Sequence, residues 1–137
     1  MAQNIVCFSG LLLFVLGLLN GLIIPKSKSP RLSLSAHLTA VQSGTFLIAI
    51  AWAWPRFNLP TPTSILVARA LSASMFVLWF AFFLAGIWGA GRNLPIAGLE
   101  SKTEPVRQGI VTMLLALGVI GTIAASAFLL FQLSGYA

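Results

Sequence analysis

Four long apolar runs dominate the chain and are separated by short segments that contain proline or polar residues. The runs cover about residues 5–24, 34–54, 65–89 and 109–133. Each is long enough to cross the ~30 Å hydrocarbon layer as a helix, which takes about 20 residues. Backbone groups in lipid must bond to one another, which favours helices over open strands. The pattern predicts an all-α fold, with residues 1–137 forming a single integral membrane domain of four transmembrane helices.

Composition excludes a soluble domain, because 58% of the residues are hydrophobic and only 7% are charged, against about 25% charged in typical soluble domains. The net charge of +6 is scattered at the ends of the runs, so we expect lipid headgroups as the partner of these residues and no nucleic acid. Cys7 is the only cysteine, which rules out an intrachain disulfide or thiolate cluster. The first run is too long for the core of a cleavable signal peptide.

Basic residues predict the orientation of the bundle. Six of the eight lie between runs one and two or between runs three and four: Lys26, Lys28, Arg31, Arg92, Lys102 and Arg107. The positive-inside rule then places these two segments in the cytoplasm and both termini outside, which is the periplasm for a bacterial inner-membrane protein. His37, the only histidine, would lie near the cytoplasmic end of the second helix.

Small residues recur at helix-packing spacing in every run. The series are Gly17-xxx-Gly21, Ala36-xxx-Ala40-xxx-Gly44, Gly86-xxx-Ala90 and Gly121-xxx-Ala125. Such spacing is typical of close helix packing in membranes. The series in the second run lies beside His37, and it would also admit a flat cofactor.

Acidic residues are absent from all four runs, since Glu100 and Glu104 both precede the fourth. Ion-coupled pumps generally use a carboxylate within the membrane, so this class is disfavoured. A Ser–His–Asp arrangement is also disfavoured, because no acid within the runs can orient His37.

His37 has three interpretations from residue chemistry alone. It is an interfacial histidine bonded to a neighbour, a general base, or an axial ligand of haem iron. A bis-histidine cytochrome needs two such residues, and one chain supplies one. A single strong protein ligand would leave a coordination position for a substrate, which suits chemistry better than electron relay.

Residues around His37 divide by their angle on the helix. Ser33 lies one turn earlier on the same face, and Ala40 and Gly44 continue that face. Ser33 could accept the imidazole N–H and leave the other ring nitrogen free. Ser43 points nearly the opposite way, so we expect it to serve another surface.

Two further segments offer polar groups at the same membrane face. Arg31 could pair with a carboxylate such as a haem propionate, or with a lipid headgroup. Arg92 and Asn93 lie in the run WGAGRNLPIAG, which ends the third helix and could fold over a site beside His37.

The segments FSGLLLFVLGLLNGLIIP, SPRLSLSAHLTAVQSGTFLIA and WGAGRNLPIAG closely resemble the hydroxylaminobenzene mutase family. A more remote resemblance, centred on the Ala–His step and the glycine seven residues later, is to styrene oxide isomerase, a four-helix membrane enzyme that uses haem b. The resemblance implies that His37 ligates the haem iron. It also implies a homo-oligomer, with a trimer expected, in which the haem lies near subunit interfaces.

The chain departs from both families at two points. Ser43 stands where they tend to have asparagine, just before Gly44. The tyrosine that the epoxide isomerase uses in its third helix has no counterpart near Leu84 and Ala85, and the only tyrosine is Tyr136. This absence favours a mutase over an epoxide isomerase.

The resulting hypothesis is a haem-dependent isomerase that converts arylhydroxylamines to 2-aminophenols. Ferric iron held by His37 would act as a Lewis acid on the N–O bond, and Ser43, Arg92 and Asn93 are the candidate catalytic side chains. Ala40 and Gly44, together with Arg31 and Ser33, would bind the cofactor. The alternatives are an epoxide isomerase, a membrane electron carrier without catalytic activity, and a small structural or transport protein without a cofactor.

Overall fold

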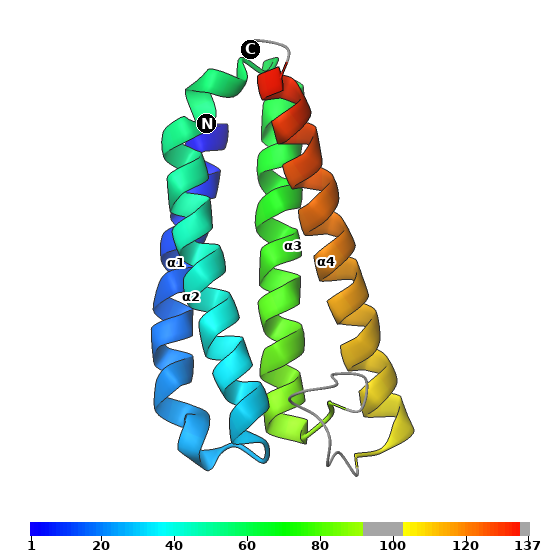
Figure 1. Ribbon diagram of the computed structural model, residues 1–137. Coiled ribbons are helices and arrows are strands. Elements are labelled where there is room, and N and C mark those ends of the chain that lie inside the picture. Colours follow the sequence, from blue (N-terminus) through cyan, green and yellow to red (C-terminus); the bar gives the residue numbers. More distant parts are fainter. Residues whose placement is uncertain (92–102, 135–137) are drawn as a thin grey trace.

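A computed structural model describes residues 1–91 and 103–134. Its helices are α1 (Ala2–Ile23), α2 (Pro30–Ala53), α3 (Thr61–Trp88) and α4 (Pro105–Ser134), and short 3₁₀ turns follow α1 and α2 at Ile24–Lys26 and Trp54–Phe57. All four helices are long and apolar enough to cross a membrane. The predicted all-α membrane bundle is therefore confirmed (Figure 1).

Each helix begins three or four residues earlier than the apolar pattern predicts. Proline explains three of these starts: Pro30 and Pro105 are the first residues of α2 and α4, and Pro62 is the second residue of α3. Proline is favoured in the first helical turn because the N–H that it lacks has no partner within the helix there. One consequence is that His37 lies two turns inside α2.

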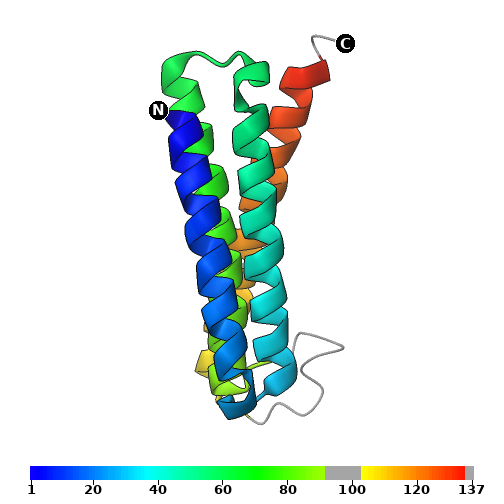
Figure 2. The ribbon, with the colours of Figure 1, turned by 90° about the vertical axis from the view of Figure 1, so that its left-hand side faces the viewer.

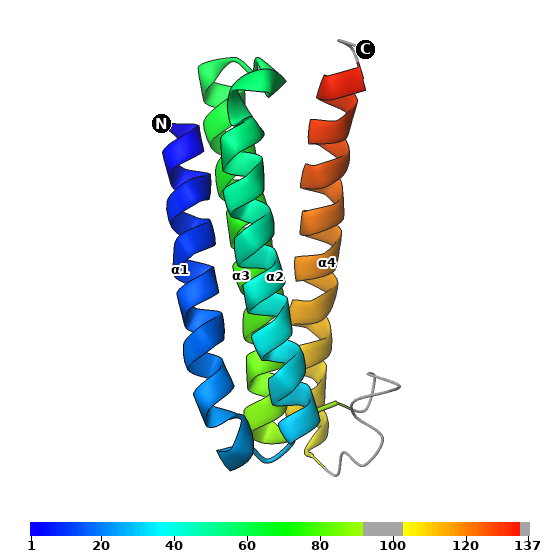
Figure 3. The same ribbon diagram turned by 60° about the vertical axis from the view of Figure 1, so that its left-hand side comes forward.

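The helices run alternately up and down, so that the α1–α2 connection, the last residues of α3 and the first residues of α4 lie at the same end (Figure 1). Helices α1, α2 and α3 pack against one another, as the view from the side of α1 shows (Figure 2). Helix α4 packs mainly on α3 and stands on the side away from α1 (Figure 3). The bundle is therefore a trio of helices with a fourth attached to one member.

Small residues bring the helix backbones into direct contact. A Cβ atom on Gly44 would lie 2.7 Å from the backbone nitrogen of Phe14, and one on Gly10 would lie 2.9 Å from the carbonyl oxygen of Gly44. A Cβ on Gly86 would similarly lie 2.9 Å from the backbone of Ser33, between α3 and α2. Lipid gives no hydrophobic drive for helix association, so close packing of this kind holds the bundle together.

Gly118 and Gly109 of α4 form a matched pair for testing this packing. A Cβ on Gly118 would lie 2.8 Å from the backbone of Leu78 on α3, whereas a Cβ on Gly109 would meet nothing within 4 Å. We expect Gly118→Ala to lower the free energy of unfolding in detergent by about 1–3 kcal/mol, the usual cost of overpacking. Gly109→Ala should leave it unchanged or raise it by up to ~1 kcal/mol, because alanine is the better helix former. Equal effects of the two substitutions would contradict the described α3–α4 contact.

Candidate functional site

The imidazole of His37 lies against α1. Its Nδ1 atom is 2.7 Å from the carbonyl oxygen of Gly17, and the side chain is half-buried. A carbonyl oxygen can only accept a hydrogen bond, so Nδ1 carries the proton and donates it. In the neutral ring Nε2 is then the nitrogen with a free lone pair. A backbone carbonyl on one ring nitrogen commonly orients a histidine that binds a metal or a proton through the other.

Gly21 makes room for this ring. A Cβ at this position would lie 3.1 Å from Nδ1 and 3.2 Å from Cε1 of His37. The pair Gly17 and Gly21, predicted from spacing to pack helices, therefore also seats the imidazole. One glycine offers the carbonyl, and the other, one turn on, leaves the space.

Ser33 does not have the role expected of it. The imidazole hydrogen-bonds to the Gly17 carbonyl rather than to the Ser33 hydroxyl. Ser33 is 3% exposed and lies where α2 meets α3 at Gly86, and its backbone carbonyl accepts a hydrogen bond of 3.0 Å from Nδ2 of Asn20. The reason is that α1 approaches closely enough for its own backbone to reach the ring.

The small-residue face of α2 was expected to admit a flat cofactor, but within one chain it packs against α1. Ala36 and Ala40 are fully buried, and Ala40 and Gly44 lie directly against Gly17 and Phe14 of α1. Helix α1 thus occupies the face that was expected to receive the flat cofactor. A face lined by small side chains admits a helix backbone as readily as it admits a cofactor.

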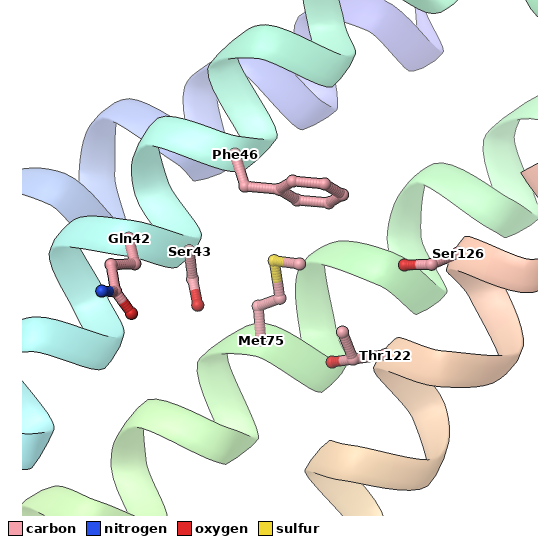
Figure 4. A pocket seen from close by; sticks show the side chains of 6 residues that line it. All are labelled: Gln42, Ser43, Phe46, Met75, Thr122 and Ser126. Atoms are coloured by element: carbon pink, nitrogen blue, oxygen red, sulfur yellow. The ribbon is translucent and has the colours of Figure 1, made fainter.

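Ser43 lines a groove of about 310 Å³ on another side of α2. Figure 4 shows Ser43 and Phe46 of α2 facing the hydroxyls of Thr122 and Ser126 of α4 across the Met75 side chain of α3. The groove is at the small end of the range for ligand pockets, about 300–1,000 Å³. It combines an aromatic ring and a thioether with several hydroxyl groups, which suits a small aromatic molecule with a polar substituent.

His37 and Ser43 are consequently not brought together within one chain. The imidazole faces α1, while Ser43 faces α3 and α4, and α1 and α4 stand on opposite sides of the bundle (Figure 3). The prediction from helix angle that Ser43 serves another surface agrees with this placement. Within one chain, the two residues therefore lie on different surfaces of α2.

Three other candidates complete the set. Arg31 is exposed in the first turn of α2, at the same end of the bundle as His37. Arg92 and Asn93 lie outside the described residues. The roles assigned to these side chains stay predictions.

Sequence reasoning missed the contributions of α1 and α4. Asn20, with Gly17 and Gly21, holds the turn of α2 that carries His37, and Thr122 and Ser126 line the groove beside Ser43. Asn20 could have been found from the sequence, because an amide side chain that lies within a membrane span and between two glycines indicates a hydrogen bond between helices. No periodicity could have paired Thr122 with Ser43, since that pairing depends on where α4 docks.

The single histidine makes the ring geometry directly measurable. In the full chain labelled with ¹⁵N-histidine, we expect the ¹⁵N shifts to report mainly the Nδ1–H tautomer. Gly21→Ala should lower the proportion of this tautomer, because the new methyl group presses on Nδ1 and Cε1. Gly109→Ala serves as the control, and an Nε2–H tautomer in the unsubstituted chain would contradict the Gly17 contact.

Comparison with known proteins agrees with the resemblance noted in the sequence. Hydroxylaminobenzene mutase HabA of Ectopseudomonas oleovorans is 36% identical over 129 residues, which cover 93% of this chain and 96% of that protein. Hydroxylaminobenzene mutase HabB of the same organism is 36% identical over 107 residues, or 77% of this chain and 65% of that protein. No solved structure matches significantly. A family model described as styrene oxide isomerase matches residues 2–134, and the chain therefore belongs to the styrene oxide isomerase family, a family of isomerases.

Proposed function

We propose that the chain is a membrane isomerase that rearranges arylhydroxylamines to 2-aminophenols, with His37 at the centre of its site. The observation that carries this proposal is the hydrogen bond from His37 Nδ1 to the Gly17 carbonyl, which leaves Nε2 free for a ligand. The two relatives named hydroxylaminobenzene mutase supply the substrate class.

A haem b group is the cofactor that we propose for this site. The donor chemistry fits, since the Gly17 contact leaves the Nε2 lone pair of the neutral ring available and the ring is only half-buried. His37 would hold the iron, and Arg31, exposed at the same end of α2, would pair with a haem carboxylate. When bound, the group would supply a ferric Lewis acid that weakens an N–O bond with no net transfer of electrons. Ala40 and Gly44 do not fit as a cradle within one chain, because α1 covers them.

The side chains of this protein would bind and orient the substrate. Phe46 and Met75 can pack on its aromatic ring, and the Ser43 hydroxyl can hydrogen-bond to its hydroxylamino group. The surrounding helices are apolar, so bulk water would be kept from a reactive intermediate. Exclusion of water would therefore keep water from adding to that intermediate and diverting it to another product.

We further propose that the complete site forms between copies of the chain in a homo-oligomer, with a trimer expected. Placement of His37 and Ser43 on different sides of α2 supports this proposal. In a cyclic trimer each interface joins two different patches, so one copy can offer His37 and its neighbour Ser43.

An epoxide isomerase on the same scaffold is the second candidate, and the description of the matching family model favours it. The buried Ala85 stands near the position where the epoxide isomerase has its tyrosine. Supplying the purified protein with phenylhydroxylamine and styrene oxide in parallel distinguishes the two activities. We expect turnover of the hydroxylamine.

His37→Ala tests the central role of the imidazole. We expect it to lower the rate of 2-aminophenol formation at least ~10²-fold, the scale on which disturbed metal ligation is felt, with loss of haem absorption. The assay contains no reductant or redox partner, because the proposed rearrangement needs no net transfer of electrons. Thr45→Val, an exposed change on the same helix, should retain activity. Full turnover by the His37→Ala protein would refute the proposed site.

Mixed oligomers test whether the site is shared. His37→Ala and Ser43→Leu chains, each expected to be impaired alone, are co-expressed with different affinity tags and purified through both. If neighbouring copies supply the two residues, every purified trimer has about a third of its sites intact, because a three-copy ring that contains both chains has one interface that joins an intact His37 to an intact Ser43. Recovery no greater than that of either variant alone would place both residues in one chain.

A further inference from the structure

We propose that Asn20 is a positioning residue that fixes the orientation of the His37 imidazole. Asn20 is 2% exposed, within the span of α1, and its Nδ2 donates a hydrogen bond of 3.0 Å to the carbonyl oxygen of Ser33. This bond crosses between α1 and α2 one turn before His37. The inference rests on the proposed function only for the importance of His37.

Two hydrogen bonds between α1 and α2 hold the two ends of a single turn of α2. At one end Asn20 binds the Ser33 carbonyl, and at the other the Gly17 carbonyl accepts the proton of His37 Nδ1. Asn20 and Gly17 lie three residues apart on α1, and Ser33 and His37 lie four apart on α2, so each pair lies on one face of its helix. With both ends held, the turn can neither rotate about the axis of α2 nor slide along α1, and Nε2 keeps one direction.

The oxygen of the Asn20 amide indicates that Asn20 does not serve mainly to stabilise the fold. Its Oδ1 atom is buried and has no hydrogen-bond partner among the described residues. A buried acceptor without a donor is unfavourable, and an apolar side chain would avoid that cost. The Ser33 carbonyl would keep its bond within α2 without Asn20, because backbone bonding in a helix runs from each N–H to the carbonyl four residues earlier.

Ser72 of α3 provides a matched control. It is 5% exposed, and its hydroxyl is likewise buried without a partner in the described part of the chain. It differs from Asn20 in making no hydrogen bond between α1 and α2. Ser72→Ala therefore removes a buried polar group of the same kind and leaves the turn that carries His37 untouched.

The experiment uses the full chain in lipid nanodiscs, labelled with ¹⁵N-histidine and produced in a host strain that cannot make haem. Asn20→Leu, Asn20→Ala and Ser72→Ala are compared with the unsubstituted chain. We expect both Asn20 variants to fold and to lower the ratio of the Nδ1–H to the Nε2–H tautomer about threefold or more, the factor that loss of one average interhelical hydrogen bond in lipid implies. Ser72→Ala should leave the ratio unchanged.

Three outcomes would overturn the proposal. The first is an unchanged tautomer ratio in folded Asn20 variants, and the second is failure of both variants to fold, which would make Asn20 a structural residue. The third is an equal change in Ser72→Ala. Because no haem or substrate is present, the result is independent of whether the proposed isomerase activity is found.

Discussion

Small residues let the backbones of α1 and α2 approach so closely that a carbonyl of one helix accepts a proton from the imidazole of the other. The contact between Gly10 and Gly44 and the contact between Gly17 and Ala40 set this distance, and Gly21 leaves the space that the ring fills. A histidine in a membrane span needs a protein partner, because lipid offers none. The Gly17 carbonyl meets that need at Nδ1 and so determines which nitrogen is free.

The same packing divides the candidate site between two surfaces. Helix α1 covers the small-residue face of α2, so His37 lies at the edge of the α1–α2 pair, while Ser43 opens onto the groove bounded by α3 and α4. A membrane enzyme of four helices has little interior in which to enclose a cofactor and a substrate together. The proposed site between copies would solve this problem, and Thr122 and Ser126 of α4 would then line its substrate side.

The sequence was sufficient for the fold, because length and hydropathy allow few alternatives in lipid. It also singled out His37 and showed by helix angle that Ser43 points elsewhere. The expected partner of the imidazole was Ser33, the polar residue one turn earlier on the same helix face, because the Gly17 carbonyl cannot be recognised from side-chain chemistry. Spacing correctly indicated close helix packing on the small-residue face of α2. Whether such a face receives a helix or a flat cofactor depends on tertiary packing, which spacing does not show.

The absorption spectrum of the purified protein, recorded before and after addition of phenylhydroxylamine without a reductant, tests the central claim most directly. We expect a ferric haem band that shifts when the hydroxylamine is added, while 2-aminophenol accumulates and no oxidised or reduced product forms. A colourless preparation that still converts the hydroxylamine would contradict it, because His37 would then act without iron.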